Sequence, residues 1–420
     1  MTIKRSLCLV LSCLLLCAAL GGCGLKDMPP VPTVTPEATV APSAEPVAEP
    51  TPEPTAEPTP EPVPDVTLPD GTTVPGNSSS VDFSALSDAE VPAAVSCLGE
   101  LPSLQLIELG QERPGLSWDS IKQLSDASGE ADINYSFTLY DKQFYLADTR
   151  MDLNHIPVED GGALVCQAAE CMKNLRQLDM DSCGVSNEEM EVIRDQLPQV
   201  KVIWRIWFGD SYSVRTDVKM ILASKPSIGG TLYTGNCEPI KYCKDLRYID
   251  LGHNTLISEI GFLSDMPKLE VAILAKNELT DISPLASCPM LEYLEIQGTW
   301  VSDLSPLSGL KNLKHLNFCS CPYINDISPL YGLTQMERLW VGGSMCNVPP
   351  EQVEEMQKCV PDCLINTTAA ETEGQWRYAE VGSLYPLHPR YIQLIEQFNG
   401  YDEDAYSFYW NDPLYEAKGE

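Results

Sequence analysis

Hydrophobic positions recur at a nearly fixed interval in the second half of the chain. Four near-copies of one unit begin at Leu246, Leu269, Leu291 and Leu313, and a fifth begins at Met336, at intervals of 22 or 23 residues. Each of the first four opens with Leu-x-x-(Leu/Ile/Ala)-x-(Leu/Ile/Phe). Alternating apolar positions place one face of a short strand in a core and turn the intervening residues outward. One such unit cannot bury its apolar face alone, so the pattern predicts a stack of units.

A small polar residue or thiol stands three positions after the last apolar residue of each unit. These turn residues are Asn254, Asn277, Thr299, Cys321 and Ser344, and Cys183 holds the same position in an upstream unit. We expect their side chains to bond backbone groups that would otherwise be buried unpaired. Three units continue with the same turn, "DISPL" at 281–285 and 326–330 and "DLSPL" at 303–307.

A fixed period with this pattern is the signature of leucine-rich repeats. Between Leu246 and about Val341 the block resembles the 22-residue repeats of bacterial internalin-like surface proteins. The resemblance implies an α/β repeat solenoid, a horseshoe whose parallel β-sheet lines the concave face. Residues 349–359 predict a helix with proline at its start, and such a helix would shield the open end of the array. Regular repeats and a C-terminal cap are therefore assigned to residues 246–367.

Longer units of the same kind are predicted upstream, over residues 81–245. The strand-like segments "LQLIEL", "LRQLDM" and "LRYIDL" begin at Leu104, Leu175 and Leu246, 71 residues apart. Helical patterns follow the first two, with Ser117 and Ser186 as N-caps. Further strands are predicted at 131–140, 150–153 and 200–208. We therefore expect irregular, helix-bearing leucine-rich repeats with insertions.

The N-terminus predicts a secretion leader over residues 1–22. Two basic residues precede an apolar run from Leu7 to Leu20, which is too short to favour a membrane-spanning helix. The leader ends Leu20-Gly21-Gly22-Cys23 and resembles a bacterial lipobox. That resemblance implies cleavage before Cys23, acyl chains on a lipidated start at residues 23–27, and anchoring on the extracellular face of the cell membrane. The alternative is an ordinary leader cut elsewhere, in which Cys23 is incidental.

A linker rich in proline, threonine and glutamate is predicted over residues 28–80. Between Met28 and Pro75 it contains no lysine, arginine or aromatic residue. Such a segment cannot bury enough surface to fold, and its prolines favour the extended polyproline II conformation. We predict a disordered, semi-rigid stalk.

Net charge and the positions of the cysteines argue against two classes of protein, nucleic-acid-binding proteins and disulfide-stabilised domains. The formal net charge of −33 and the pI near 4.3 argue against nucleic acid as a partner. Sixteen cysteines suggest a disulfide framework at first sight. However, Cys183 and Cys321 occupy turn positions, and Cys243 and Cys288 stand three residues before a repeat start, where other units carry apolar residues. This placement favours buried free thiols, which behave as small hydrophobes.

Residues between the apolar positions of each strand should line the concave face. This column contains aromatic, acidic and amide side chains, and we take nine of its members as candidate ligand contacts: Asp179, Tyr248, Asp250, Tyr293, Glu295, His315, Asn317, Arg338 and Trp340. Rings beside polar groups supply the stacking area and direction that recognition requires. The alternative is a solvated sheet face, which would also be polar.

The C-terminal segment 368–420 is rich in aromatic residues, with 11 of the 32 in the chain lying from Trp376 onward. It predicts either a cap packed on the last repeats or a separate binding module. The sequence contains four histidines and no zinc motif, phosphate loop or Gly-x-Ser-x-Gly elbow. We therefore predict no catalytic residue, metal site or cofactor.

Two functions fit these features. The first is a non-catalytic surface protein that binds a protein or glycan through its concave face, in adhesion, sensing or another surface interaction. The alternative is a cell-wall-associated enzyme or enzyme subunit that uses the repeats for targeting. Its candidate acids are Asp402, Glu403, Asp404 and Asp412, near Trp410.

Overall fold

The computed structural model describes residues 63–112, 115–209, 212–224, 232–343, 345–370 and 376–377. Several sequence predictions lie outside these residues: the leader 1–22, Cys23 and the lipidated start 23–27, the stalk up to residue 62, Ser344, and the tail 378–420 with its candidate acids. None of the described helices combines the length and apolar character needed to cross a membrane.

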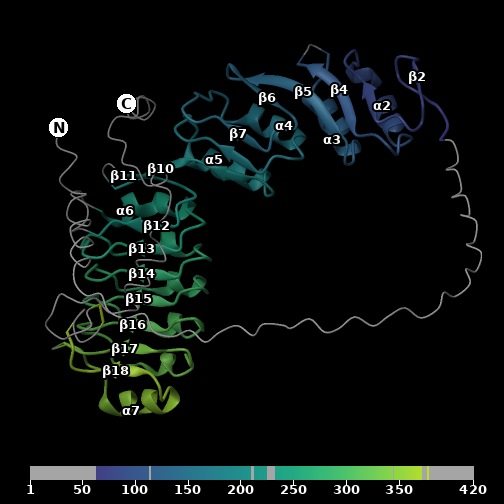
Figure 1. Cartoon of the computed structure of the whole chain (residues 1–420). Coiled ribbons are helices and arrows are strands. Elements are labelled where there is room, and N and C mark those ends of the chain that lie inside the picture. The colour runs from purple at the N-terminus through teal and green to yellow at the C-terminus, as the bar shows by residue number, and fades with distance from the viewer. Residues whose placement is uncertain are drawn as a thin grey trace, which may run out of the picture. The chain divides into compact units, whose positions relative to one another are not determined.

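Seven parallel strands, one from each rung, form the largest sheet of the described chain. In order they are β12 (Met220–Leu222), β13 (Tyr248–Asp250), β14 (Val271–Ile273), β15 (Tyr293–Glu295), β16 (His315–Asn317), β17 (Arg338–Trp340) and β18 (Leu364–Asn366). Figure 1 shows them stacked one above another in chain order. The predicted repeat solenoid is confirmed, and its sheet extends one strand beyond the regular repeats at each end.

Short helices return the chain on the other side of each rung. They are η2 (Glu238–Tyr242), η3 (Gly261–Leu263), η4 (Ser283–Ser287), η5 (Ser305–Leu307), η6 (Ser328–Leu330) and α7 (Pro350–Cys359), with α6 (Thr234–Cys237) before η2. In the "DISPL" and "DLSPL" turns, the Asp281, Asp303 and Asp326 carboxylates accept hydrogen bonds from the backbone N–H two residues later, at 2.7–2.8 Å. The following proline occupies the first helical turn, where no N–H is needed.

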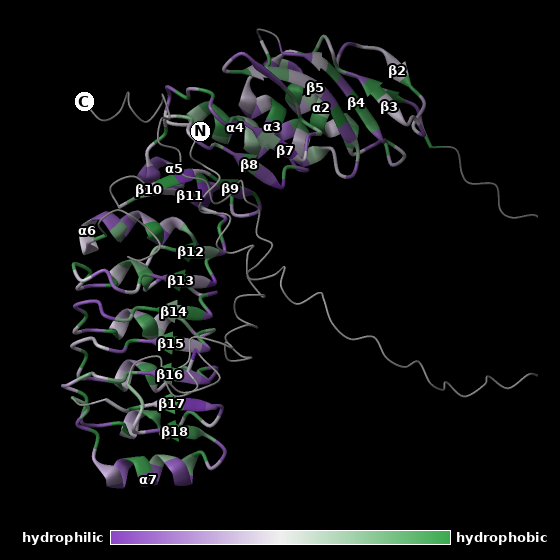
Figure 2. Cartoon of the chain, turned by 60° about the vertical axis from the view of Figure 1, so that its left-hand side comes forward, coloured by the Kyte–Doolittle hydropathy of each residue, from purple (hydrophilic) through white to green (hydrophobic). Residues whose placement is uncertain are grey.

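The opening leucines of the repeats form the core. Leu246, Leu269, Leu291 and Leu313 are fully buried, and they belong to one hydrophobic cluster that runs from Val66 to Cys363. In Figure 2 each rung carries both hydrophobic and hydrophilic stretches, as alternating strands and polar loops require.

Residues upstream of β12 form smaller sheets with longer helices. The strands are β3 (Ser80–Asp82), β4 (Leu106–Gln111), β5 (Asp132–Leu139), β6 (Lys142–Tyr145), β7 (Arg150–Asp152), β8 (Gln177–Asp179) and β9 (Lys201–Ile203). The helices are η1 (Asp88–Glu90), α2 (Val91–Leu98), α3 (Trp118–Ala127), α4 (Ala163–Cys171) and α5 (Asn187–Gln196). Strands β3–β5 and β7–β9 pair in parallel, whereas β6 and the hairpin β10 (Arg205–Phe208)–β11 (Tyr212–Arg215) are antiparallel. These antiparallel pieces are the insertions that lengthen the upstream units.

The folded chain begins earlier than the predicted end of the linker at residue 80. Strands β1 (Val66–Thr67) and β2 (Thr73–Val74) form a hairpin, and Val66 and Leu68 are buried. Gly71 adopts a positive φ of 83° in the turn. A few apolar residues among prolines gave no periodic signal in the sequence, so this hairpin was indistinguishable from linker.

The described cysteines are all free thiols. Cys243 and Cys288 are fully buried at the core positions that their spacing indicated, and burial raises the pKa of Cys288 to about 12. These thiols therefore act as hydrophobic core residues.

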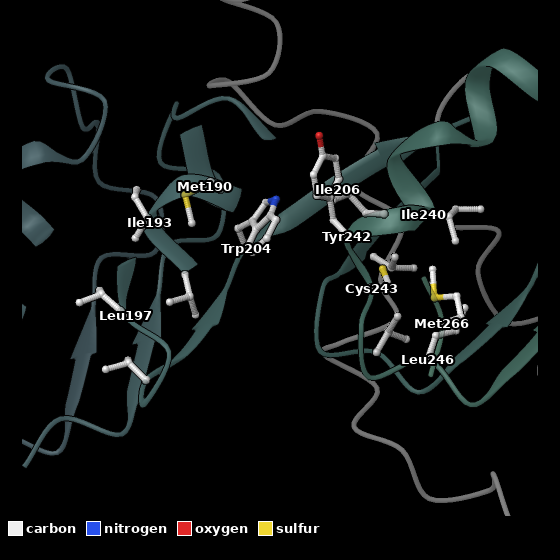
Figure 3. Packing of buried hydrophobic residues seen from close by; sticks show 14 of the residues in the cluster. Met190, Ile193, Leu197, Trp204, Ile206, Ile240, Tyr242, Cys243, Leu246 and Met266 are labelled. Atoms are coloured by element: carbon white, nitrogen blue, oxygen red, sulfur yellow. The ribbon is translucent and has the colours of Figure 1, made fainter. Parts of the chain in front are cut away.

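An aromatic pair joins the helix-bearing unit of α5 to the rung of β12. Figure 3 shows Trp204 and Tyr242 side by side among buried aliphatic side chains, and their ring centroids are 5.8 Å apart. The guanidinium of Arg194 lies 4.9 Å from the centre of the Trp204 ring, and Trp204 Nε1 donates to Asn187 Oδ1 at 2.9 Å. This packing makes the core continuous where the two kinds of unit meet.

We predict that Trp204→Ala lowers the free energy of unfolding by about 3–5 kcal/mol, because it leaves a cavity beneath Tyr242. Urea denaturation measures the change. Val192→Ala on the exposed face of α5 is the matched control and should change stability by no more than about 0.5 kcal/mol. Equal midpoints for the two variants would contradict the role given to Trp204.

Candidate functional site

Two rows of side chains cross the largest sheet on the face opposite the leucine core, here called the inner face. The strand register places Tyr248, Val271, Tyr293, His315 and Arg338 in one row, and Asp250, Ile273, Glu295, Asn317 and Trp340 in the other. Eight of the nine predicted ligand contacts therefore share this face. The ninth, Asp179, lies on β8 in the separate sheet β7–β8–β9.

The predicted contacts on the inner face are covered in this structure. Those of strands β15–β17 are at most 5% exposed, as is Tyr248, whereas Asp250 is only half-buried. Tyr293, Trp340 and Trp376 belong to a second hydrophobic cluster, distinct from the leucine core. The sequence led us to expect a face open to solvent, but part of the chain that follows β18 lies on it.

The chain turns back across the inner face directly after β18. The Asn366 side-chain oxygen accepts hydrogen bonds from the N–H groups of Thr368 and Ala369, at 2.9 and 2.8 Å. Cys319 Sγ then lies 3.3 Å from the carbonyl oxygen of Ala369, to which it donates. A Cβ added to Gly342 would lie 2.2 Å from that same oxygen. Only glycine at position 342 therefore allows the returning backbone to pass so close to β17.

The indole of Trp376 is the centre of the contact between this returning segment and the sheet. Its ring centroid lies 5.2 Å from those of both Tyr293 and Trp340, and the guanidinium of Arg338 lies 4.5 Å from it. Trp376 Nε1 donates to Glu295 Oε1 at 2.8 Å, and its carbonyl oxygen accepts from Arg338 Nη1 at 2.8 Å. The indole is fully buried, with stacking, cation–π and hydrogen-bond contacts together.

Glu295 is the polar hub of the contact. Its carboxylate accepts hydrogen bonds from Tyr293 Oη at 2.6 Å, Gln297 Nε2 at 3.0 Å and Arg377 Nε at 2.9 Å, in addition to the indole. Arg377 Nη2 forms a second, short ion-pair contact. Burial acts to raise the pKa of Glu295, but the Arg377 charge and the hydrogen bonds outweigh it and hold the pKa below its usual value. The carboxylate is therefore ionised and paired, as a buried charge must be.

His315 and Asn317 support this arrangement from β16. His315 Nδ1 accepts a hydrogen bond from Arg338 Nε at 3.1 Å, which orients the guanidinium toward the indole. Asn317 Oδ1 accepts from the N–H of Cys319 at 3.0 Å, so its role is to turn the end of the strand. We name Tyr293, Glu295, His315, Arg338 and Trp340 the indole slot.

Asp179 belongs to a different, fully paired network. Its carboxylate accepts from Arg150 Nε at 2.6 Å, Arg215 Nη2 at 3.1 Å and Gln177 Nε2 at 2.8 Å. It is buried, and its neighbours neutralise it. The structure thus gives Asp179 a stabilising position between β7, β8 and β11.

The predicted turn residues bond the backbone at the ends of the strands. Asn254 Nδ2 donates to the carbonyl oxygens of Leu251 and Ala223, both at 2.9 Å, and Asn277 Oδ1 accepts from Asn254 N–H at 3.0 Å. Further along, Thr299 Oγ1 and Cys321 Sγ both donate to the Ile296 carbonyl, at 2.7 and 3.1 Å. Cys183 is buried at the corresponding place upstream.

An exposed apolar stripe along one edge of the rungs was not predicted from the sequence. It consists of Leu256, Trp300, Tyr323 and Met345, each 55–56% exposed. Each of these residues follows a turn residue by one or two positions, just before the chain re-enters the core. A large apolar residue recurring at that place was the signal available in the sequence. We name this set the edge stripe.

Within the described ranges, no group of three or more histidine, cysteine or acidic side chains is placed to hold a metal ion. A hollow of about 620 Å³ lies beside α5 and η2, but its cations are paired. Lys201 lies 3.3 Å from Asp217, and Lys244 contacts Asp265.

A comparison with protein families finds leucine-rich repeats in part of the chain. A family model described as leucine-rich repeats, two copies, matches residues 289–332. No curated protein matches the chain. Similar solved structures include internalin C2 from Listeria monocytogenes (18% identity, 61% of this chain and 93% of that chain, TM-score 0.29). They also include an internalin, inlF, from the same species (17%, 68% and 88%, TM-score 0.29) and a leucine-rich-repeat protein of Leptospira interrogans (15%, 64% and 74%, TM-score 0.33). Residues 289–332 are thus leucine-rich repeats by sequence, and β12–β18 continue the same fold on both sides.

Asp250 provides a pH test of the inner face. Burial raises its pKa to about 6, opposed by a hydrogen bond from Gly252 N–H at 2.9 Å, whereas an unfolded aspartate titrates near 3.9. The folded chain binds this proton more tightly, so ionisation of Asp250 lowers stability progressively as pH rises from about 4 through 6. Asp250→Asn removes that loss while its amide oxygen still accepts from Gly252.

We therefore expect the stability advantage of Asp250→Asn over the native chain to grow between pH 4 and pH 7, by up to about 3 kcal/mol. Paired urea titrations at several pH values measure the difference, in which the other titrating groups cancel. An advantage that stays constant with pH would contradict the burial of Asp250.

Proposed function

We propose that this protein is a lipid-anchored, extracellular leucine-rich-repeat protein of a bacterium. On this proposal it binds a protein or glycan partner through its inner face without catalysing a reaction. Leucine-rich-repeat proteins commonly bind partners on their extended concave surfaces. The observation that carries the proposal is the indole slot, in which side chains of β15, β16 and β17 contact a distant segment of the same chain.

The chemistry of the slot favours binding over simple coverage of the sheet. Tryptophan, tyrosine and arginine are the residues that dominate binding energy at protein interfaces. Here Tyr293 on β15 and Arg338 and Trp340 on β17, on either side of β16, come together around the Trp376 indole. The chain's net charge of −33 would also speed the approach of a basic partner.

The anchor and the location rest on the sequence of the leader. The apolar run, the small residues before Cys23 and the proline-rich linker together support acylation of Cys23 outside the cytoplasm. The linker would then hold the repeats away from the membrane.

The enzyme alternative finds no specific support. Its candidate acids Asp402, Glu403, Asp404 and Asp412 lie outside the described residues. Assaying the full chain for hydrolysis of cell-wall polymers tests it, and turnover that depends on these acids would replace the binding proposal.

Changing the lipidated residue tests the anchor. In a bacterial host, Cys23→Ser should abolish incorporation of labelled palmitate and move the protein out of the membrane fraction, because the acyl chains have no attachment site. Cys13→Ser inside the leader is the matched control and should leave both properties unchanged. Unaltered labelling of Cys23→Ser would show that the anchor lies elsewhere.

Affinity capture tests the surface. The full chain, immobilised, is exposed to cell-surface extracts, and each captured species is quantified by mass spectrometry. We expect Tyr293→Ala,Trp340→Ala to weaken capture of a specific partner by at least about thirtyfold, the scale of an interface hot spot. Trp300→Ala on the edge stripe is the control. Circular dichroism verifies that each variant is folded. If capture is lost only with Trp300→Ala, the binding surface is the edge stripe instead.

A further inference from the structure

The indole slot has a resident occupant, the Trp376–Arg377 pair of the same chain. We propose that the slot is a receptor for a protein segment carrying a tryptophan followed by an arginine, and that Trp376–Arg377 closes it until such a segment displaces the pair. This inference rests on the proposed function, since it names the chemistry and the regulation of the same site.

The slot is built for a charged ligand. Glu295 is fully buried and Arg338 is 5% exposed, and burying either group is costly unless an opposite charge or hydrogen-bond partner is supplied. If this face of the sheet needed only to be covered, apolar residues would be sufficient. Val271 and Ile273 are such residues on the neighbouring strand β14, and both are buried. The presence of Glu295 therefore selects an occupant that brings its own cation.

Two donor groups define that occupant. Glu295 Oε1 accepts hydrogen bonds from the indole Nε1 at 2.8 Å and from Arg377 Nε at 2.9 Å. One carboxylate therefore binds both side chains at the same time. The rings of Tyr293 and Trp340 fix the position of the indole between them. A glycan has no guanidinium to pair with this carboxylate, and so a basic protein segment is the ligand class we infer.

The resident pair leaves one buried acceptor beside the indole slot without a donor among the described residues. Gln297 Nε2 donates to Glu295, but Gln297 Oε1, which is buried, accepts no hydrogen bond in the described part of the chain. An unmade hydrogen bond of a buried group costs about 1–3 kcal/mol. An outside segment with one more donor beside its arginine would satisfy this oxygen and bind better than the chain's own pair.

The resident pair competes from within the chain. A tethered segment acts at an effective concentration in the millimolar range. If a free peptide binds the open slot with a Kd near 10 µM, closure by the tethered pair weakens its apparent binding on the order of a hundredfold. Opening the slot should therefore produce a gain of binding, which general loss of structure cannot mimic.

Gly342 provides the means of opening the slot without changing its residues. A Cβ at this position would meet backbone atoms of the returning segment, at 2.2 Å from the Ala369 oxygen and 2.9 Å from its nitrogen. Gly342→Ala must therefore shift that segment. A Cβ on Gly309 would meet nothing within 4 Å, so Gly309→Ala is the matched control.

The test is binding of a labelled synthetic peptide of sequence TEGQWRYAEV, residues 372–381, to the full chain, followed by fluorescence anisotropy. We expect Gly342→Ala, and independently Trp376→Ala,Arg377→Ala, to bind it about a hundredfold more tightly than the native chain and Gly309→Ala do. Replacing the tryptophan of the peptide with alanine, or adding Glu295→Gln to the opened chain, should abolish the gain.

Equal affinity for native and opened chains, or no binding to folded opened chains, would overturn the inference and make Trp376–Arg377 a fixed part of the fold. A dimeric Gly342→Ala chain in sedimentation that the peptide dissociates would support the inference, because the tail of another copy would then be the segment bound in the slot. A partner captured through Tyr293 and Trp340 that the peptide fails to displace would overturn this inference while leaving the proposed function intact. Peptide binding without any captured partner would support the slot chemistry and count against the proposed function.

Discussion

Each rung of this protein can bury its apolar face only against a neighbour, and this constraint governs the whole described chain. It requires strands in parallel register, so that the leucines of successive rungs meet in one core. It also forces the chain to turn at the same place in every rung, where Asn254, Thr299 and Cys321 bond buried backbone oxygens. Side chains on the inner face do not pack in the leucine core, and several of them are polar or charged.

On the inner face the dominating interaction is the buried carboxylate of Glu295. Strands about 4.8 Å apart carry Tyr293 and Glu295 on β15 and Arg338 and Trp340 on β17, on either side of β16. The indole of Trp376 contacts residues of both strands. The carboxylate then needs a cation that the rungs beside it do not provide in the right place, since Arg338 is directed to the Trp376 ring and carbonyl. Arg377 supplies that charge. The returning segment therefore covers the inner face of the sheet and also forms specific hydrogen bonds and an ion pair with it.

Local and periodic features were visible in the sequence, whereas the long-range crossing was not. The repeat starts, the caps at Ser117 and Ser186 and the two inner-face rows follow from spacing alone, and the structure places each where spacing indicated. The contact between Trp376 and Glu295 joins residues 81 positions apart. It occurs once in the chain, so the repeat pattern of the sequence could not predict it. The β1–β2 hairpin was hidden for a related reason, because its few apolar residues stand among the prolines of a linker. The edge stripe lies between these cases, because it recurs in four of the five repeats, on the side exposed to solvent, and the unit of Asn277 has Glu278 there instead.

The central claim is that the Trp376 indole is buried against Glu295, and hydrogen exchange at the indole nitrogen measures this most directly. In the ¹⁵N-labelled full chain, the Trp376 resonance is identified by its loss in Trp376→Phe. Burial predicts that its Nε1–H exchanges far more slowly than that of a solvent-exposed indole such as Trp300, and that Glu295→Gln accelerates it. Exchange of the Trp376 indole at the rate of Trp300 would contradict the account, because the slot would then be open in the native chain.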